Sequence, residues 1–253
     1  MTTTTHVERT RRIAEPESAT STWTETARTI GIWSALGTFV MYLLYIPVLV
    51  VGFAVAGNVE DPLEDPYLAI LEVLILLMAP LLVLMMVAVY AYASAPMKAF
   101  SLAALIHMIF AAATTTAVHF VLLTVDRQID EGDIPGRAFL FSWEWPSVAY
   151  ALDILAWDWF LGISMLLAVP VFTGGGRLLT SLRATLIFGG GLSLAGVVGP
   201  ALGNIDLRWI GQVGYEAVFP AACLLIALVF RRTVPASRQQ DREASASTAK
   251  GMT

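Results

Sequence analysis

Six long apolar stretches limit what this chain can fold into more than any other feature of its sequence. They cover residues 30–57, 67–93, 99–125, 146–172, 182–203 and 209–230. Each is close to the roughly 20 residues that cross a bilayer as a helix, and a helix satisfies its own backbone polar groups in lipid. The strands of a membrane barrel would instead alternate over about ten residues. The sequence therefore predicts an all-α integral membrane protein, a six-helix transmembrane bundle.

The composition makes lipid the solvent for most of the chain. Hydrophobic residues make up 57% and charged residues 14%, with a mean hydropathy of +0.71, against about 45–50% and about 25% in soluble domains. Residues 30–232 form the predicted transmembrane domain. The polar segments 1–29 and 233–253 lack apolar periodicity and are predicted to be disordered tails. The sequence contains no basic patch interleaved with aromatic residues, so it does not predict nucleic-acid binding.

The distribution of lysine and arginine predicts the orientation. Twelve of these residues fall in the two tails and in the loops after the second and fourth stretches, and three fall in the remaining loops: Arg127, Arg137 and Arg208. Positive residues concentrate on the cytoplasmic side of membrane proteins. We therefore expect both termini in the cytoplasm of a multi-pass protein of the cell membrane.

Ionisable residues inside the apolar stretches are the main functional signal, because such groups are costly in lipid and normally face the protein interior or a wet cavity. Four of them lie at a similar depth, about 8–10 Å below the outer end of four different helices at 1.5 Å per residue: Glu72, His119, Asp153 and Glu216. We expect these four side chains to converge on one outward-open cavity that binds a ligand or proton. The nearby side chains assigned to the same cavity are Tyr150, Trp157 and Asp158.

Helix geometry sets limits on this cluster. Asp158 is five residues after Asp153 and therefore about 140° around a regular α-helix, so the two should not point squarely at one partner. His107 and His119 are about 120° apart around one helix and cannot share an ion. If a metal binds, we expect His119 and Asp153 to hold it. A cluster of this kind can also be purely structural, with interhelical hydrogen bonds that hold the bundle together.

Small residues in the fifth stretch predict close helix packing. Gly191, Ala195, Gly199 and Gly203 follow one another at four-residue spacing, which lets another helix approach. The interpretation is that this helix is central in the bundle, or that it forms a contact in a homo-oligomer or with another membrane subunit.

The aromatic residues before the fourth stretch have two interpretations. Phe139, Phe141, Trp143 and Trp145 are typical of an interfacial belt, and they could equally form a lid over a cavity.

Several familiar chemistries are excluded. Gly162-Ile163-Ser164-Met165 resembles the serine motif of rhomboid proteases, but the sixth stretch lacks the histidine base which that chemistry needs, so Ser164 is expected to bond its own helix backbone. The lysines of a retinal Schiff base and of a P-loop are also missing.

The sequence favours a non-enzymatic transporter, sensor or accessory subunit for a proton, cation or small solute. The alternative is an intramembrane metal-dependent enzyme that uses His119 and the carboxylates. The sequence identifies no cofactor.

Overall fold

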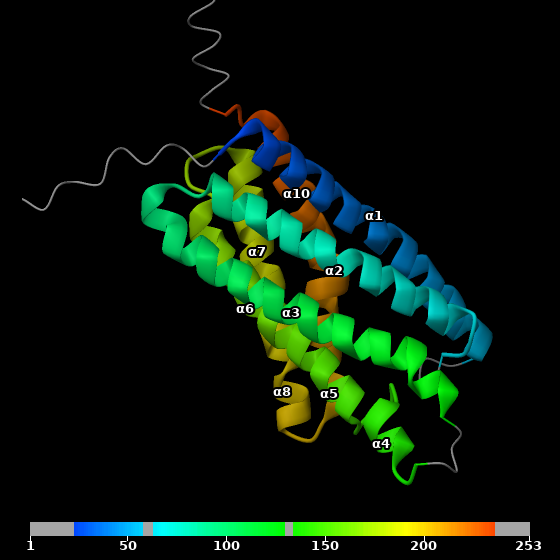
Figure 1. The fold of residues 1–253 in the computed structure, drawn as a ribbon. Coiled ribbons are helices and arrows are strands. Elements are labelled where there is room, and N and C mark those ends of the chain that lie inside the picture. The colour runs from blue at the N-terminus through cyan, green and yellow to red at the C-terminus, as the bar shows by residue number, and fades with distance from the viewer. Residues whose placement is uncertain (1–22, 58–62, 130–133, 236–253) are drawn as a thin grey trace, which may run out of the picture.

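The computed structural model describes residues 23–57, 63–129 and 134–235, which contain helices and no strand (Figure 1). Six helical segments in this part of the chain are long and apolar enough to cross a membrane: Glu25–Ala56, Tyr67–Tyr92, Ala95–Gln128, Val148–Val171, Arg177–Ala201 and Ile205–Arg232. The prediction of six helices able to cross a membrane is therefore confirmed. Most of the two predicted tails, residues 1–22 and 236–253, lies outside the described residues.

The first three spans are nearly continuous helices, whereas the last three are built from shorter elements. The first, second and third spans contain α1 (Glu25–Ala56), α2 (Tyr67–Tyr92) and α3 (Lys98–Thr124), respectively. The fourth joins α5 (Val148–Ile154), the π-helix η3 (Leu155–Phe160) and α6 (Leu161–Ala168); the fifth joins α7 (Arg177–Gly196) and α8 (Val198–Ala201). The sixth contains η5 (Ile205–Arg208), α9 (Trp209–Gln212), the π-helix η6 (Val213–Val218) and α10 (Phe219–Arg232), and the short α4 (Arg137–Phe141) precedes the fourth.

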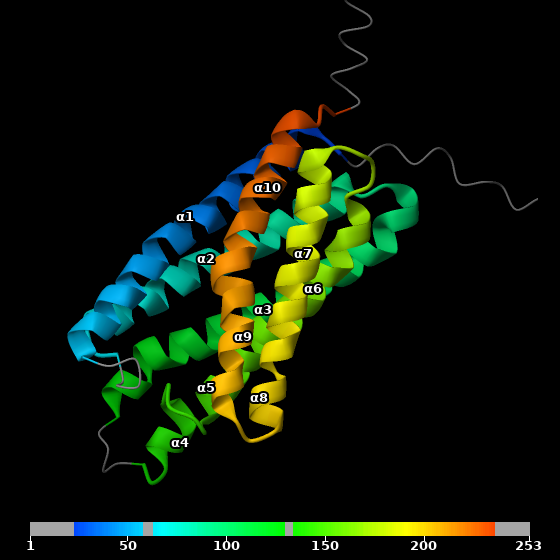
Figure 2. The same ribbon diagram turned by 180° about the vertical axis from the view of Figure 1, so that it is seen from behind.

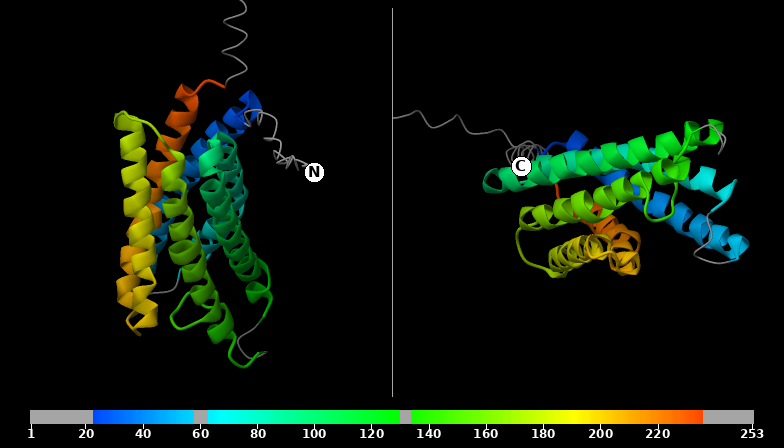
Figure 3. Two further views of the ribbon diagram at one scale, coloured as in Figure 1. Left: turned by 90° about the vertical axis from the view of Figure 1, so that its left-hand side faces the viewer. Right: turned by 90° about the horizontal axis from the view of Figure 1, so that it is seen from below.

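The helices form two layers, with α1, α2 and α3 in one and the last three spans in the other (Figure 3). Each helix packs on the next along the chain, and α10 closes the ring by packing on α1. Viewed from behind, α1 and α10 lie close at the end where the described chain begins and finishes, and they diverge toward the opposite end (Figure 2). Aromatic rings of Trp23, Tyr92, Phe172 and Phe230 fill the closed end.

The first helix begins earlier than the apolar stretch predicted. Residues 25–29 were assigned to a disordered tail, but they form the first turn of α1, and the Thr24 side chain caps it by accepting a hydrogen bond from the Ala27 amide at 3.1 Å. The Arg28 guanidinium donates to the Phe230 carbonyl at 2.9 Å and to the Arg231 carbonyl at 2.9 Å. Capping and this link to α10 stabilise a polar turn that hydropathy alone does not reveal.

Most of the close approaches between helices use glycines outside the predicted stripe, of whose glycines only Gly199 makes a close contact. No atom of another residue lies within 4 Å of where a Cβ on Gly191 or Gly203 would stand, and Gly199 meets the turn that follows it. Close approach instead uses the neighbouring face of α7. A Cβ on Gly190 would come within 2.8 Å of the Gly162 carbonyl oxygen, and one on Gly196 within 2.7 Å of the Gly211 Cα.

The reason is helical drift. Each four-residue step advances about 400°, so three steps turn the stripe by about 120° away from its starting face. Gly189, Ser193 and Gly196 alternate steps of four and three residues, and all three are buried. Such alternation keeps side chains on one face. The oligomer contact proposed for Gly191, Ala195, Gly199 and Gly203 stays a prediction.

Adjacent glycines of α7 offer a matched test. We expect Gly190→Ala to lower the thermal stability of the detergent-solubilised protein by about 1–3 kcal/mol, the usual cost of overpacking, because the Gly162 backbone cannot yield. Gly191→Ala should leave stability unchanged or raise it slightly, since alanine favours a helix over glycine by about 1 kcal/mol. Equal melting temperatures for the two variants would contradict the assigned packing face. A smaller oligomer in Gly191→Ala alone would support the predicted contact between copies.

Candidate functional site

Three of the four side chains predicted to converge are joined by direct contacts. His119 on α3 places its Nδ1 2.5 Å from the Glu72 carboxylate on α2 and its Nε2 3.6 Å from the Asp153 carboxylate on α5. All three are buried. An imidazole donates from both nitrogens only when it is protonated, so an acid at each nitrogen favours a positively charged His119.

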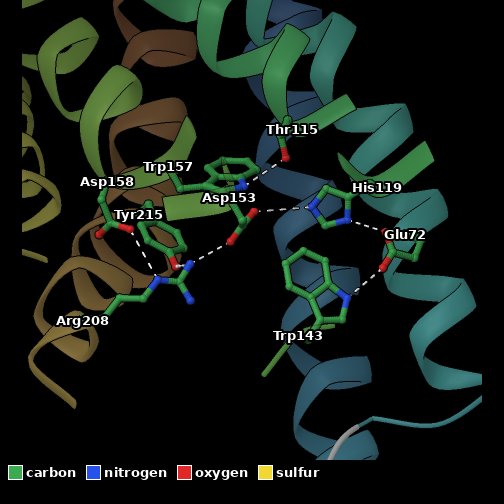
Figure 4. A network of polar contacts seen from close by, with 9 residues as sticks. All are labelled: Glu72, Thr115, His119, Trp143, Asp153, Trp157, Asp158, Arg208 and Tyr215. Atoms are coloured by element: carbon green, nitrogen blue, oxygen red, sulfur yellow. Dashed lines mark hydrogen bonds and ion pairs between the residues drawn. The ribbon is translucent and has the colours of Figure 1, made fainter. Parts of the chain in front are cut away.

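Arg208 extends the chain of contacts beyond Asp153 (Figure 4). Its Nη2 donates to Asp153 Oδ2 at 2.7 Å and to the Tyr215 hydroxyl at 3.0 Å. Its Nε lies 3.5 Å from Asp158 Oδ2, and its guanidinium lies over the Tyr150 ring, 4.4 Å from the centroid. One arginine thus contacts two aspartates of the fourth span and links them to the start of the sixth.

Sequence reasoning missed Arg208 by assigning it to an outer loop. The side chain is buried, with 4% of its surface exposed. A usable signal was present: acids inside a membrane need a cationic partner, and Arg208 directly precedes the last span on the side where lysine and arginine are scarce. The tertiary fold was needed to choose among Arg127, Arg137 and Arg208, because the first two pair with Asp65 and Asp126 instead.

The expectation that Asp153 and Asp158 face different partners is wrong, since both contact Arg208. The π-helix η3 (Leu155–Phe160) carries Asp158 and widens the helix, so that residues five apart become neighbours. Space for the carboxylate comes from two glycines. A Cβ on Gly196 would stand 2.2 Å from Asp158 Oδ1, and one on Gly211 1.7 Å from it. Asp158 is completely buried, and neither of its oxygens accepts a hydrogen bond from a described residue.

Aromatic side chains frame the network. Trp157 stacks on Tyr215 with centroids 5.6 Å apart and donates its Nε1 hydrogen to the Thr115 hydroxyl at 3.1 Å. Trp143 donates to Glu72 Oε1 at 3.1 Å and packs on His119. Of the two interpretations of the aromatic loop, the position of Trp143 favours a lid, whereas Phe139 is 59% exposed, as in a belt.

A cavity of about 220 Å³ lies beside the network, between α1 and α2 on one side and the fourth and sixth spans on the other. Glu72, His119, Asp153 and Glu216 all contribute to its walls, as do Tyr150 and Trp157. Glu216 stands on the π-helix η6 (Val213–Val218), is half-buried, and interacts with the Gln212 side chain one turn earlier. The structure therefore brings the predicted residues around one cavity, with Asp158 behind its wall.

The donor set does not favour a metal centre. Among the described residues, no group of three or more histidine, cysteine and carboxylate side chains is arranged to hold a metal ion. Both nitrogens of His119 already face acids. His107 is separate, with its Nδ1 2.8 Å from the Ala103 carbonyl of its own helix.

Ser164 differs from expectation, because its hydroxyl donates to the Ala104 carbonyl on α3 at 2.8 Å rather than to its own helix.

Comparisons with protein families, curated proteins and solved structures give no match to this chain. The function must therefore be argued from the geometry of the cavity and its network.

Removing the charge of Arg208 tests the network. We expect Arg208→Gln to destabilise the protein by about 3–5 kcal/mol, because it leaves the buried Asp158 without a cation and Asp153 with His119 alone. Adding Asp158→Asn should recover part of this loss, and thermal unfolding of the two single variants and the double variant measures the coupling. Arg127→Gln is the matched control, since it breaks a surface pair with Asp65 that contributes about 0–1 kcal/mol. Additive effects of Arg208→Gln and Asp158→Asn would show that the two residues do not interact.

Proposed function

We propose that this chain is a multi-pass membrane protein that admits a small solute from the extracytoplasmic face into the cavity beside His119 and Arg208, as a transporter or a sensor. The observation that carries the proposal is the cavity itself, whose walls take charged side chains from four spans. Ionisable groups in membrane spans are costly and typically mark substrate or ion pathways.

The two π-helices support a functional rather than a purely structural role. η3 carries Trp157 and Asp158, and η6 carries Tyr215 and Glu216. Single π-helical turns within α-helices are rare and occur frequently at functional sites. A network needed only for stability gains little from such distortion, because replacing buried ion pairs by apolar side chains is often neutral or stabilising.

The proposed orientation follows from the distribution of positive charge. Burial of Arg208 strengthens it, because only Arg127 and Arg137 then remain as loop cations at the end of the bundle that holds the cavity. The positive-inside tendency puts that end outside the cytoplasm.

The opposite half of the bundle is filled with side chains. Phe172, Leu182 and Phe230 are completely buried there, and none of them lines the cavity. This arrangement fits an outward-open transporter or a sensor that reports binding through its helices. Transport requires the two halves to rearrange, which the kinked and π-helical fourth and sixth spans could accommodate.

Thiol labelling tests access to the cavity and its orientation together. The chain has one cysteine, Cys223, which is completely buried, so the parent protein should not react. We expect Gln212→Cys, in the cavity wall, to react with a membrane-impermeant thiol reagent applied to the outside of intact cells. Gly175→Cys, in the loop before α7, should react only after the membrane is opened.

Failure of Gln212→Cys to react from either side would contradict an aqueous cavity. Reaction only from the inside, together with outside labelling of Gly175→Cys, would retain the cavity and reverse the orientation.

A further inference from the structure

We propose that the solute is a small organic ammonium ion, whose charge is balanced by Glu216 and whose body lies against the tyrosine rings of the cavity. This inference rests on the proposed function, because it names the class of molecule that the cavity admits.

The charge balance of the cavity calls for a cation. Four acids line it, Glu72, Glu144, Asp153 and Glu216, against two bases, His119 and Arg208. Both bases are engaged by acids, and Arg208 also contacts Asp158 behind the wall. The exposed Glu144 lies at the rim, where water screens it. The cavity therefore has a surplus of negative charge inside a medium that disfavours it.

Glu216 is the acid that carries this surplus. It forms no ion pair with any described residue, and the Gln212 amide that interacts with its carboxylate is neutral. It lies close enough to Arg208, Asp153, Tyr42 and Tyr45 to interact with them electrostatically, but Arg208 is engaged directly by Asp153 and Asp158. Since the side chain is only half-buried in the cavity wall, a ligand can reach it.

The walls suit the body of an organic cation. Eight of the twenty lining residues are aromatic, four of them tyrosines: Tyr42, Tyr45, Tyr150 and Tyr215. Aromatic faces attract cations, and the attraction strengthens when water is excluded. The protein already uses one of these rings in this way, because the Arg208 guanidinium lies over Tyr150.

An independent sign of a missing ligand is the hydroxyl of Tyr42. Tyr42 is buried, with 2% of its surface exposed, and it lines the cavity. Its hydroxyl has no hydrogen-bond partner among the described residues. Buried polar groups are nearly always hydrogen-bonded. An ammonium N–H beside Glu216 would donate to this oxygen, which completes a pocket of one carboxylate, one hydroxyl and aromatic faces.

An anion fits this cavity less well. Its cations are Arg208, which already contacts two aspartates and Tyr215, and His119, which lies between Glu72 and Asp153. An anionic ligand would have to displace those acids and approach Glu216 as well. Like charges brought together in a low-dielectric site repel strongly.

The test uses the purified full-length protein in lipid nanodiscs and isothermal titration calorimetry. The probes are benzylamine and methylammonium, both of which carry N–H donors, with neutral benzyl alcohol and anionic benzoate as comparisons of similar shape to benzylamine. We expect binding of at least one ammonium probe at millimolar concentration or below, and no binding of benzoate. Glu216→Gln should weaken ammonium binding at least tenfold. Asp206→Asn, which removes an exposed acid at the same end outside the cavity, should not change it.

The outcomes separate this inference from the proposed function. Binding of benzoate or benzyl alcohol as tightly as benzylamine, or ammonium binding that Glu216→Gln leaves intact, would overturn the assignment to organic cations. So would the absence of ammonium binding in a protein whose Gln212→Cys variant is labelled from outside, and in that case the cavity would stand. Thermal unfolding of Glu216→Gln like that of the parent would confirm that lost affinity reflects the carboxylate and not a lost fold.

Discussion

Pairing of charge inside an apolar medium is the constraint on which this structure depends. Arg208 lies within reach of Asp153 and Asp158, and His119 lies between Asp153 and Glu72, so the contacts join the second, third, fourth and sixth spans. Unpaired, any of these groups would cost several kcal/mol in the bilayer core. The network therefore selects one relative placement of four helices, where apolar packing against lipid would tolerate many.

Backbone irregularity makes that placement feasible. The π-helical turn η3 brings Asp158 toward the face of Asp153, and Gly196 and Gly211 leave the space that its carboxylate occupies. A side chain on either glycine would collide with Asp158. Small residues here serve two purposes, since they let helices approach closely and also admit a charged group between them.

The same elements create the cavity. α1 and α10 are held together at one end by Arg28, which donates to the last carbonyls of α10, and they diverge at the other (Figure 2). The open end is lined by Tyr42 and Tyr45 from α1 and by Tyr215 and Glu216 from η6. Paired charges and aromatic side chains thus line the same cavity.

The amino-acid sequence alone predicted the number of apolar helices and that Glu72, His119, Asp153 and Glu216 lie at similar positions along four of them, because hydropathy and helical rise are local properties of the chain. Only the tertiary structure decided the partners. Arg208, predicted to lie in a loop, belongs to the network, and the π-helix η3 directs Asp158 toward it. Likewise, α7 approaches its neighbours closely at Gly190 and Gly196, whereas a Cβ on Gly191 would meet no neighbour. Each of these outcomes depends on how separate helices rotate and distort to pair buried charges, and a regular α-helix drawn from sequence contains no information about that rotation.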